Sequence, residues 1–508
     1  MEYLVGIDVG TSATKTVLFD RTGAVVASVS REYPLYQPHN GWAEQDCADW
    51  KDAALSTLGD VVAKAGVAPG DVKGIGLSGQ MHGLVMLDEH GEVLRPSIIW
   101  CDQRTENEVA DMLRLWPREK WIEVTANPPL TGWTAAKILW VKKNEPEVFA
   151  RCRHILLPKD YIRYVLTGEF ATEVSDASGM QLLDVPHRCW SREVMDLLGL
   201  DISLFGKVYE SCEVTGTLLP EVASAVGLST ETKVVGGAGD NAAAAVGTGV
   251  VLDGTAFTTI GSSGVVFAHC DQAAIDPKGR VHTCCAAVPG TWHVMGVTQG
   301  AGLSLKWFKD NFCQDYVEKA REEGVDPYVL TDRDAARVPV GSDRLIYLPY
   351  LMGERTPHLD PNCRGVFFGI SAIHTKAHFL RAIMEGVTYS LRDCNDILGE
   401  MGIGVDEMMA CGGGGTSKLW RQMLADLYKC PVKTVKQTEG PALGVAILAG
   451  VGCGLFPSVP EACAALISKV GGAEPDAKNA ETYDGYHALY RELYGDLKES
   501  YKKLAKLG

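Results

Sequence analysis

The sequence predicts an α/β protein built from two related domains that face each other across a cleft. The chain has 508 residues, about three times the length of one ordinary domain. Short β-rich runs alternate with longer stretches of helical spacing, which is the pattern of an α/β fold. A glycine-containing hairpin occurs in each half, around Gly10 and around Gly261. We therefore predict two domains, residues 1–250 and 251–508.

The first domain is predicted to open with three strands and a helix. Residues 3–8, 14–19 and 25–30 are β-rich and are separated by short turns. Apolar residues then recur at helical spacing over 48–65, and 72–77 reads as a buried strand. Strands followed by a helix and another strand favour a mixed sheet covered by helices.

The second half repeats part of this order. Residues 256–260 and 265–268 form a hairpin like the one that opens the chain, and a further strand is expected near 292–297. Residues 483–504 have an apolar face and predict an amphipathic closing helix. The two similar hairpins suggest an internal duplication.

Composition excludes several classes of partner. The chain is 46% hydrophobic and 22% charged, as globular proteins are. It has 64 acidic and 48 basic residues, a net charge of −16. Because this field repels phosphate backbones and anionic lipid, we expect no nucleic-acid or membrane partner.

Cysteine usage indicates a reducing compartment. The 15 cysteines form no C-x-x-C pair, which excludes a zinc ribbon and a thioredoxin-like centre. Reduced thiols in a cytoplasmic protein are the expectation, and no basic region that would mark a signal peptide precedes Asp8. Residues 440–457 lack charge but are short and glycine-rich, so we predict a helix packed against another backbone.

The two hairpins are candidate phosphate clamps. Glycine turns expose backbone N–H groups, and hydroxyl side chains add further donors for phosphate oxygens. The candidates are Thr11 and Ser12 in the first hairpin and Gly261 and Ser262 in the second. Asp8 ends the first strand, where it could hold hydrated Mg²⁺ against a triphosphate, or it is a solvated aspartate in an ordinary hairpin.

Asp240 is the candidate catalytic base. It follows a short strand and a glycine turn and opens an alanine-rich helix. Its carboxylate could accept the proton of an attacking hydroxyl, or it could simply cap the helix. The two roles are compatible, because the positive end of a helix keeps a carboxylate ionised.

Two further glycine patterns allow opposite interpretations. Residues 412–415 are four consecutive glycines, which could lie against a nucleotide or form a plain strand-to-helix loop. Gly74, Gly76 and Gly79 match a dinucleotide fingerprint in spacing, but they lie inside a strand and no helix follows, so we reject that reading. Residues 80–82 (Gln-Met-His) suit a polyol site or a core position.

Several segments, taken together and in order, resemble the FGGY carbohydrate kinases of the actin and hexokinase superfamily. They are GIDVGTSATK from Gly6, WTAAKILWVKKNE from Trp133, GGGGTSKLWRQMLADL from Gly412 and EGPALGVAILAG ending at Gly450. The resemblance covers nearly the whole chain and implies two ribonuclease-H-like domains around an ATP and sugar cleft. SGQMHG, WCDQRT, LPKDYIRYVLTGE, SDASG and GDNAAAAVG resemble the members that act on D-xylulose.

The resemblance also implies a role for each candidate residue. Asp240 would be the general base and Asp8 would serve Mg²⁺ and the phosphates. The sugar contacts would be Met81, His82, Asn241 and, close by, Asp102, while Gly413 and Gly414 would contact the nucleotide. The sequence departs from the family at residues 415–416, which are Gly-Thr, and at Met180.

The expected reaction is ATP-dependent phosphorylation of D-xylulose at its 5-hydroxyl, with Mg²⁺. The alternatives are the same chemistry on ribulose, a deoxyketose or glycerol, and a nucleotide-driven binding protein on the same fold. Members of this family are often homodimers, so a homodimer is a further expectation of the resemblance.

Overall fold

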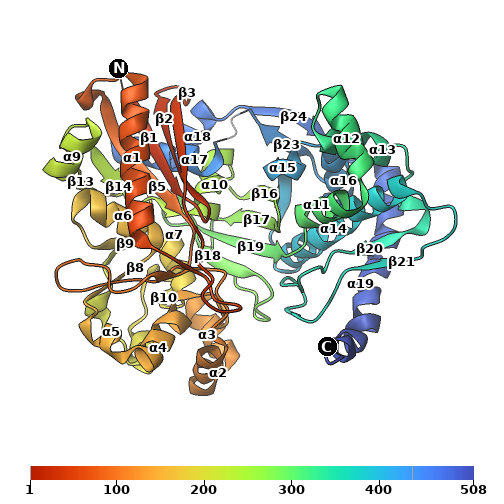
Figure 1. The fold of residues 1–508 in the computed structure, drawn as a ribbon, viewed down its shortest axis with the longest axis horizontal. Coiled ribbons are helices and arrows are strands. Elements are labelled where there is room, and N and C mark those ends of the chain that lie inside the picture. The colour runs from red at the N-terminus through yellow and green to blue at the C-terminus, as the bar shows by residue number, and fades with distance from the viewer. Residues whose placement is uncertain (1, 437–438, 508) are drawn as a thin grey trace.

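In the computed structural model the chain forms two lobes, each built on a seven-stranded sheet (Figure 1). Residues 2–436 and 439–507 are described. The first sheet has the order β13-β14-β5-β1-β2-β3, and β15 also pairs with β5. Its strands are β1 (Tyr3–Val9), β2 (Ala13–Asp20), β3 (Val25–Glu32), β5 (Val72–Gly79), β13 (Val214–Thr217), β14 (Lys233–Val235) and β15 (Ala238–Gly239).

The second sheet has the order β18-β19-β17-β16-β22-β23-β24. Its strands are β16 (Gly254–Ile260), β17 (Gly264–Cys270), β18 (His282–Cys285), β19 (Trp292–Thr298), β22 (Val405–Cys411), β23 (Val432–Val435) and β24 (Lys469–Ala473). In both sheets a central strand pairs antiparallel with the next strand of the hairpin and parallel with a later strand: β1 with β2 and β5, and β16 with β17 and β22. The two sheets therefore share the arrangement that the repeated hairpin suggested.

Helices cover both sheets. Around the first lie α1 (Cys47–Ala65), α6 (Pro158–Thr167), α9 (Pro220–Val226), α10 (Asp240–Thr248), α17 (Gly440–Gly452) and α18 (Val459–Leu466). Around the second lie α11 (Gly302–Phe312), α12 (Gln314–Glu323), α13 (Pro327–Ala335), α14 (Lys376–Glu400), α15 (Gly412–Gly415), α16 (Lys418–Tyr428) and α19 (Ala477–Leu504). The closing helix is confirmed, and it begins six residues earlier than the apolar pattern indicated.

A smaller layer of helices and two- or three-residue strands extends the first lobe. Its helices are α2 (Glu106–Leu115), α3 (Arg118–Thr125), α4 (Thr134–Asn144), α5 (Pro146–Arg151), α7 (Val174–Ala177) and α8 (Arg192–Leu198). Its strand pairs are β4 (Glu44–Gln45) with β7 (Ser97–Ile98), β6 (Val85–Leu87) with β8 (His154–Leu156), β9 (Ala171–Glu173) with β12 (Lys207–Tyr209), and β10 (Leu183–Asp184) with β11 (Cys189–Trp190). In the second lobe β20 (Ile346–Leu348) pairs with β21 (Val366–Phe368).

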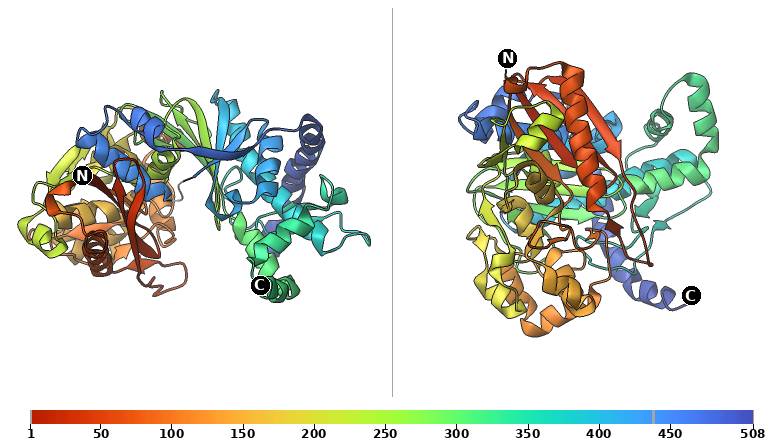
Figure 2. Two further views of the ribbon diagram at one scale, coloured as in Figure 1. Left: turned by 90° about the horizontal axis from the view of Figure 1, so that it is seen from above. Right: turned by 60° about the vertical axis from the view of Figure 1, so that its left-hand side comes forward.

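The uncharged segment after residue 439 forms α17, which is buried against the first sheet, as predicted. A Cβ atom on Gly6 would lie 1.9 Å from the carbonyl oxygen of Ala442, and one on Gly76 would lie 2.0 Å from that of Val445. The glycines of the rejected fingerprint therefore allow a helix to lie directly on strand backbones. Figures 1 and 2 show this late, blue segment beside the red strands that open the chain.

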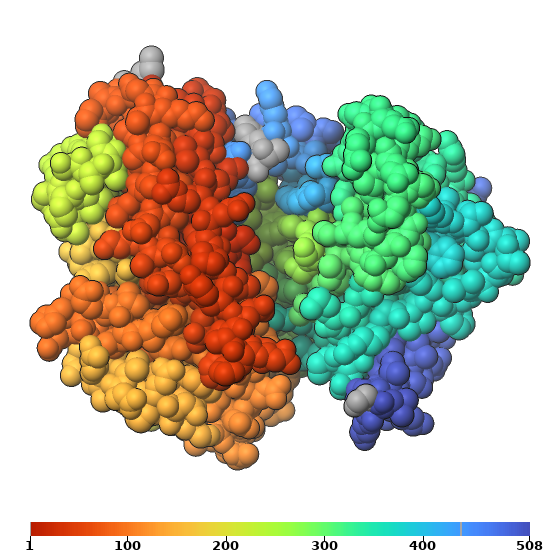
Figure 3. Space-filling model, in the orientation of Figure 1, coloured from red at the N-terminus to blue at the C-terminus, as the bar shows by residue number. Residues whose placement is uncertain are grey.

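Residues from both halves of the chain share one apolar cluster. It joins Leu4 and Phe19 of the first strands to Val246 of α10 and to residues 442–449 and 459–466. All fifteen cysteines are free thiols, in agreement with the sequence prediction. Within the described part of the chain, no helix is both long and apolar enough to cross a membrane. The space-filling view shows a hollow between the two lobes (Figure 3).

Candidate active site

The sheet register brings Asp8 and Asp240 to one edge of the first sheet. Asp8 on β1 is paired with Ser78 on β5, and Ser78 is also paired with Ala238 on β15. These strands are parallel, so their carboxyl ends meet there and Asp240 follows Ala238 by two residues. Burial, and to a smaller extent the negative charge of Asp8, raise the pKa of Asp240 to about 7.

Asp240 has one carboxylate oxygen available for proton transfer. Its Oδ1 accepts hydrogen bonds from the backbone nitrogen of Asn241 at 2.7 Å and from the side-chain nitrogen of Asn241 at 2.9 Å. Its Oδ2 has no hydrogen-bond partner among the described residues. The helix cap is Gly239 and not Asp240, so the capping alternative is not what the carboxylate does here. The bonds from Asn241 orient the carboxylate and leave Oδ2 for an incoming hydroxyl.

Asp8 offers a second, unsatisfied carboxylate. Its Oδ1 is buried without a hydrogen-bond partner in the described chain, and the same holds for the neighbouring hydroxyl of Ser78. Burial raises the pKa of Asp8, and the positive charge of Lys15 offsets part of that rise. Buried polar atoms normally have partners. Oxygen atoms left in this way fit a hydrated Mg²⁺, which prefers carboxylate and water ligands.

Hydrogen bonds hold the turn that presents Asp240. The backbone nitrogen of Gly239 donates to Ser175 Oγ at 3.1 Å, and Ser175 Oγ donates to Glu173 Oε1 at 2.9 Å. Glu173 Oε2 accepts from Ser211 Oγ at 2.9 Å, and Arg163 donates to the carbonyl of Gly236 at 3.0 Å. Glu173 and Arg163 therefore fix the backbone before the candidate base without reaching the cleft.

These residues belong to a fully buried group of five charges. Lys159 lies 2.7 Å from Asp160, 3.2 Å from Glu173 and 3.5 Å from Asp176. Arg163 lies 3.0 Å from Asp160. Both carboxylate oxygens of Asp176 lack hydrogen-bond partners in the described chain, and burial raises the pKa of Asp176 well above its usual value. Two positive and three negative side chains meet in this group, and the raised pKa of Asp176 favours the uncharged form of that one carboxyl.

Met81 and His82 adjoin the Asp240 turn. A Cβ atom on Gly239 would lie 2.9 Å from Met81 Sδ, so Met81 packs directly beside the candidate base. His82 has a left-handed backbone (φ 65°), its Nδ1 lies 2.8 Å from the carbonyl of Gly179, and its ring stacks on Trp133 at 4.8 Å. Burial is the main reason that the pKa of His82 falls to about 3, so the imidazole is neutral.

The carbonyl of His82 is held by the next helix. Lys137 Nζ donates to it at 2.6 Å and Thr134 Oγ1 at 3.1 Å, both from α4. Burial lowers the pKa of Lys137 to about 7, although the charge of Asp102 opposes the fall. Two donors on one carbonyl stabilise the strained backbone that aims the His82 ring.

Asp102 does not open to the cleft. It is fully buried; its Oδ2 accepts from the backbone nitrogen of Ala43 at 2.6 Å and from Arg104 Nη2 at 2.7 Å, and its Oδ1 accepts from the backbone nitrogen of Arg104 at 2.9 Å. Both oxygens are therefore occupied by the protein itself. The charge of Asp102 acts on Lys137, and its carboxylate has no oxygen free of protein partners for a sugar. The contact of Asp102 with a sugar stays a prediction.

The first hairpin is braced from several directions. The carbonyl of Thr11 accepts from Gln45 Nε2 at 2.7 Å, and the hydroxyl of Thr11 accepts from Trp100 Nε1 at 2.9 Å. Tyr33 donates to the carbonyl of Gly10, and Ser12 stays exposed. The hydroxyl of Thr11 accepts from Trp100 and keeps its own hydrogen for donation, so Thr11 and Ser12 both stay possible donors, and Ser12 is the more exposed of the two.

The other four predicted phosphate and nucleotide residues line one pocket of about 1130 Å³ in the second lobe. They are Gly261 and Ser262 from the second hairpin, and Gly413 and Gly414. Two residues of α11 close the hairpin side: the backbone nitrogens of Gly302 and Leu303 donate to the carbonyls of Gly261 (2.7 Å) and Ser262 (3.2 Å). The structure therefore brings together residues about 150 positions apart in the sequence.

The four-glycine run, for which the sequence allowed either a nucleotide contact or a plain strand-to-helix loop, forms the helical turn α15. A Cβ atom on Gly414 would lie 2.5 Å from the side chain of Ile260, whereas one on Gly413 would meet nothing within 4 Å. Gly414 therefore allows the turn to pack on β16, and Gly413 faces open space in the pocket. Close packing and the capped start of α16 hold this turn, so the alternative of a plain loop does not apply, while the nucleotide contact stays a prediction.

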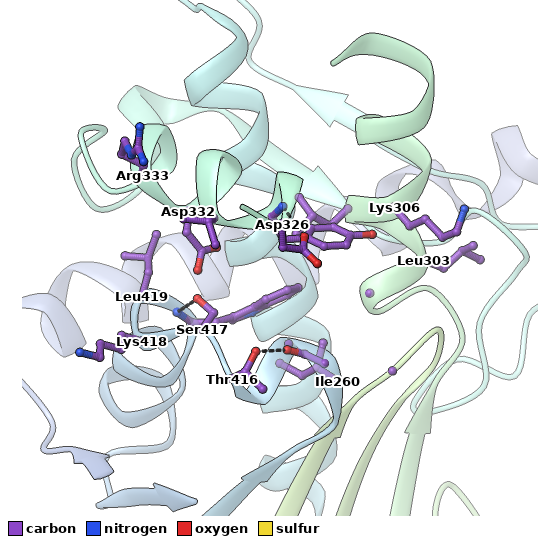
Figure 4. A pocket seen from close by; sticks show the side chains of 18 of the residues that line it. Ile260, Leu303, Lys306, Asp326, Asp332, Arg333, Thr416, Ser417, Lys418 and Leu419 are labelled. Carbon is purple, nitrogen blue, oxygen red and sulfur yellow. Dashed lines mark hydrogen bonds between the residues drawn. The ribbon is translucent and has the colours of Figure 1, made fainter. Parts of the chain in front are cut away.

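Sequence reasoning missed the rest of the pocket wall. It includes Tyr328, Val329 and Asp332 of α13 and Leu419 of α16. Figure 4 shows Asp332 and Ser417 pointing toward each other at one end, with Lys306 and Leu303 at the other. Burial raises the pKa of Asp332, and Ser417 offsets part of the rise. The exposed Tyr328 and Val329 are an apolar helix face that the sequence alone did not connect to a ligand.

The comparisons with known proteins agree with this architecture. The sequence matches the N-terminal domain of the FGGY family of carbohydrate kinases over residues 3–247 and the C-terminal domain of that family over 256–453. The chain therefore belongs to the FGGY family of carbohydrate kinases. It is a phosphotransferase that acts on a sugar, with the predicted two-domain, actin- and hexokinase-like α/β fold.

Named relatives match over nearly the full length. The chain is 38% identical to the xylulose kinase of Bacillus subtilis over 98% of each chain, and 31% identical to the gluconokinase of the same organism over 99% and 98%. The crystal structure of ligand-bound xylulose kinase from Lactobacillus acidophilus is 30% identical and has a TM-score of 0.92, covering 99% of this chain and all of that one.

Proposed function

We propose that this enzyme phosphorylates D-xylulose at its 5-hydroxyl with ATP. The observation that carries the proposal is the pair of Asp240 and Asp8 at one sheet edge beside Met81 and His82. The full-length similarity to proteins named xylulose kinase supports the choice of sugar. The predicted roles of the twelve candidate residues, including Asn241 and Asp102, are part of this proposal.

In the proposed reaction, Asp240 orients the attacking hydroxyl. Its free Oδ2 accepts the hydroxyl hydrogen while Oδ1 stays fixed by Asn241. A carboxylate is a weak base towards an alcohol, so positioning supplies most of the rate and proton transfer is late. Asp8 and Ser78 would hold Mg²⁺, which offsets negative charge on the phosphates.

The nucleotide would lie in the pocket of the second lobe. Tyr328, Val329 and Leu419 offer apolar surface for a base, and the second hairpin offers donors for phosphates. Approach of the two lobes would bring the terminal phosphate to Asp240 and exclude water. In this arrangement residues 1–250 supply the sugar and base side, and 251–508 supply the nucleotide side, apart from α17 and α18, which lie against the first sheet.

A panel of acceptors tests the proposal. ADP release is measured with D-xylulose, ribulose, a deoxyketose, glycerol and D-gluconate, each against a no-sugar control. We expect D-xylulose to give the highest kcat/KM. A higher kcat/KM for D-gluconate would assign the enzyme to the second candidate activity, which the gluconokinase similarity favours. If the rate of ADP release is the same with every sugar as in the no-sugar control, a nucleotide-driven binding protein is favoured.

A further inference from the structure

The pocket of the second lobe has two chemically different ends. At one end the backbone nitrogen of Leu303 donates to the carbonyl of Ser262 at 3.2 Å, so α11 closes on the second hairpin, where phosphates would bind. Figure 4 shows Leu303 and Lys306 at this end and Asp332 and Ser417 at the opposite end. A nucleotide whose phosphates lie at the hairpin therefore has its base near Asp332.

The surface next to Asp332 suits a flat, apolar ring. Asp332 follows Tyr328 by four residues and Val329 by three on α13, so the three side chains share one face of that helix, and all three line the pocket. Leu419 of α16 lines it too, and Figure 4 places Leu419 beside Asp332 and Ser417. A base can therefore lie against these apolar side chains with its polar edge toward Asp332.

Asp332 is the carboxylate of the pocket wall that the protein leaves open. Two acidic residues, Asp326 and Asp332, are among the described residues that line the pocket. Asp326 Oδ1 accepts from the backbone nitrogen of Tyr328 at 2.8 Å and caps α13. The nearest cation in sequence, Arg333, lies 3.3 Å from Glu323, and no ion pair of Asp332 occurs within the part of the chain that the structure describes.

The hydroxyl groups at this end leave acceptor capacity on Asp332. Ser417 Oγ accepts from the backbone nitrogen of Trp420 at 3.1 Å, and Figure 4 shows Ser417 and Asp332 pointing toward each other. Thr416 Oγ1 donates to the carbonyl of Gly413 at 2.7 Å. One serine hydrogen can occupy only one of the several acceptor positions of a carboxylate, so Asp332 keeps the others for a ligand.

We propose that Asp332 selects the base of the nucleotide by accepting a hydrogen bond from the 6-amino group of adenine. This inference rests on the proposed function, because it places the nucleotide in this pocket. An ionised carboxylate only accepts hydrogen bonds, and adenine carries an amino donor where guanine has a carbonyl oxygen. Hypoxanthine has the same carbonyl oxygen as guanine. Opposed oxygen atoms at Asp332 would therefore weaken the binding of nucleotides that carry either base.

The test measures the Kd of ADP and of IDP, which carries hypoxanthine, for wild type, D332N and D332A in the absence of sugar. We expect wild type to bind ADP at least about fivefold more tightly than IDP. D332N should lower this ratio at least about threefold, because the new amide can also donate to the hypoxanthine oxygen. D332A should weaken ADP about tenfold and leave IDP within about threefold, because it removes the acceptor alone.

D334N is the matched control on the same helix. Asp334 is not among the described residues that line the pocket, and its carboxylate contacts Tyr316 and Arg337 instead. The ratio of the two Kd values in D334N should stay within about twofold of wild type. In turnover with D-xylulose, the ratio of kcat/KM for ATP to that for ITP should fall in D332N as the Kd ratio does, with the KM for D-xylulose changed less than about twofold.

Three results would overturn the role of Asp332. They are a wild-type Kd for IDP equal to or below that for ADP, tighter binding of GDP than of ADP, and a Kd ratio that both Asp332 variants leave within twofold of wild type. A general structural defect would weaken ADP and IDP alike and so gives the third result. If D332N does not fold, the ratio in D332A decides.

Failure of this inference is distinguishable from failure of the proposed function. The Kd values are measured without sugar, so they test Asp332 even if wild type phosphorylates no sugar of the panel, which would overturn the function. Wild-type activity on D-xylulose with an unchanged Kd ratio in both Asp332 variants overturns only the role of Asp332.

Discussion

At the scale of single residues, the environment of Asp240 determines when it can act. Burial and the charge of Asp8 raise its pKa to about 7, and Asn241 opposes the rise. Only the ionised form can accept a proton. We therefore predict that about half of the free enzyme carries the ionised form of Asp240 near pH 7, and more of it at higher pH.

This predicts an acid limb in the pH profile. Below pH 7 the ionised fraction of Asp240 falls about tenfold per pH unit, so kcat/KM for the sugar should fall with a slope near one. The measurement is kcat/KM from pH 5.5 to 9 at saturating ATP and Mg²⁺. A midpoint below pH 5 would mean that the carboxylate behaves as a solvated aspartate.

Residue-scale prediction from sequence had a clear limit. Asp8, Asp240 and Asn241 stand in motifs at strand and helix ends, so their position at a sheet edge could be inferred. Asp102 stands in an equally suggestive segment, yet Ala43 and Arg104 occupy its carboxylate. A local sequence pattern does not show which carboxylates accept hydrogen bonds from other residues of the folded protein and which stay free for a ligand.

At the scale of elements, α7 links the buried charges to the base. Ser175 on α7 accepts from the backbone nitrogen of Gly239 and donates to Glu173. It therefore connects the buried charged group to the turn before Asp240 by two hydrogen bonds. Ser178, at the end of the same helix, instead accepts from the backbone nitrogen of Cys285 at 3.0 Å. The two serines are equally buried but face different partners.

Ser175→Ala should therefore slow the reaction without weakening binding. We expect kcat to fall about tenfold, because the misplacement of a catalytic group costs rate, while KM for ATP changes less than twofold. Ser178→Ala is the matched control and should keep kcat within about twofold. Equal losses in the two variants would show that Ser175 only supports the fold.

Element packing explains which parts of the fold the sequence predicted. Strands and long helices followed from periodicity, as in β1, β5 and α1. The walls of the nucleotide pocket did not, because α13 and α16 meet only in the folded lobe. Glycines that admit a neighbouring backbone, such as Gly76, look in sequence like ligand-binding glycines.

The crossing of α10 and α17 gives a stability prediction. A Cβ atom on Gly444 would lie 1.9 Å from the carbonyl oxygen of Ala243, and backbone cannot move away cheaply. Gly444→Ala should destabilise the protein by about 3 kcal/mol, seen as a lower Tm. Gly485→Ala on α19 meets nothing within 4 Å and should leave Tm equal or raise it, because alanine favours helix. An unchanged Tm in Gly444→Ala would contradict this close packing.

At the scale of the whole molecule, the candidate catalytic residues and the candidate nucleotide residues lie on two different but similar sheets. The first carries the acidic pair, and the second carries the large pocket. The net charge of −16 opposes anionic ligands, so local donors such as the hairpin N–H groups must offset it. Homodimerisation stays a prediction.

The central claim is that Asp240 catalyses phosphoryl transfer to D-xylulose. The most direct measurement is the rate of D-xylulose 5-phosphate formation by Asp240→Asn relative to wild type at pH 8, with ATP affinity measured on the same samples. We predict a loss of at least about 10³-fold with ATP affinity within threefold of wild type. Turnover within about tenfold of wild type would contradict the assignment.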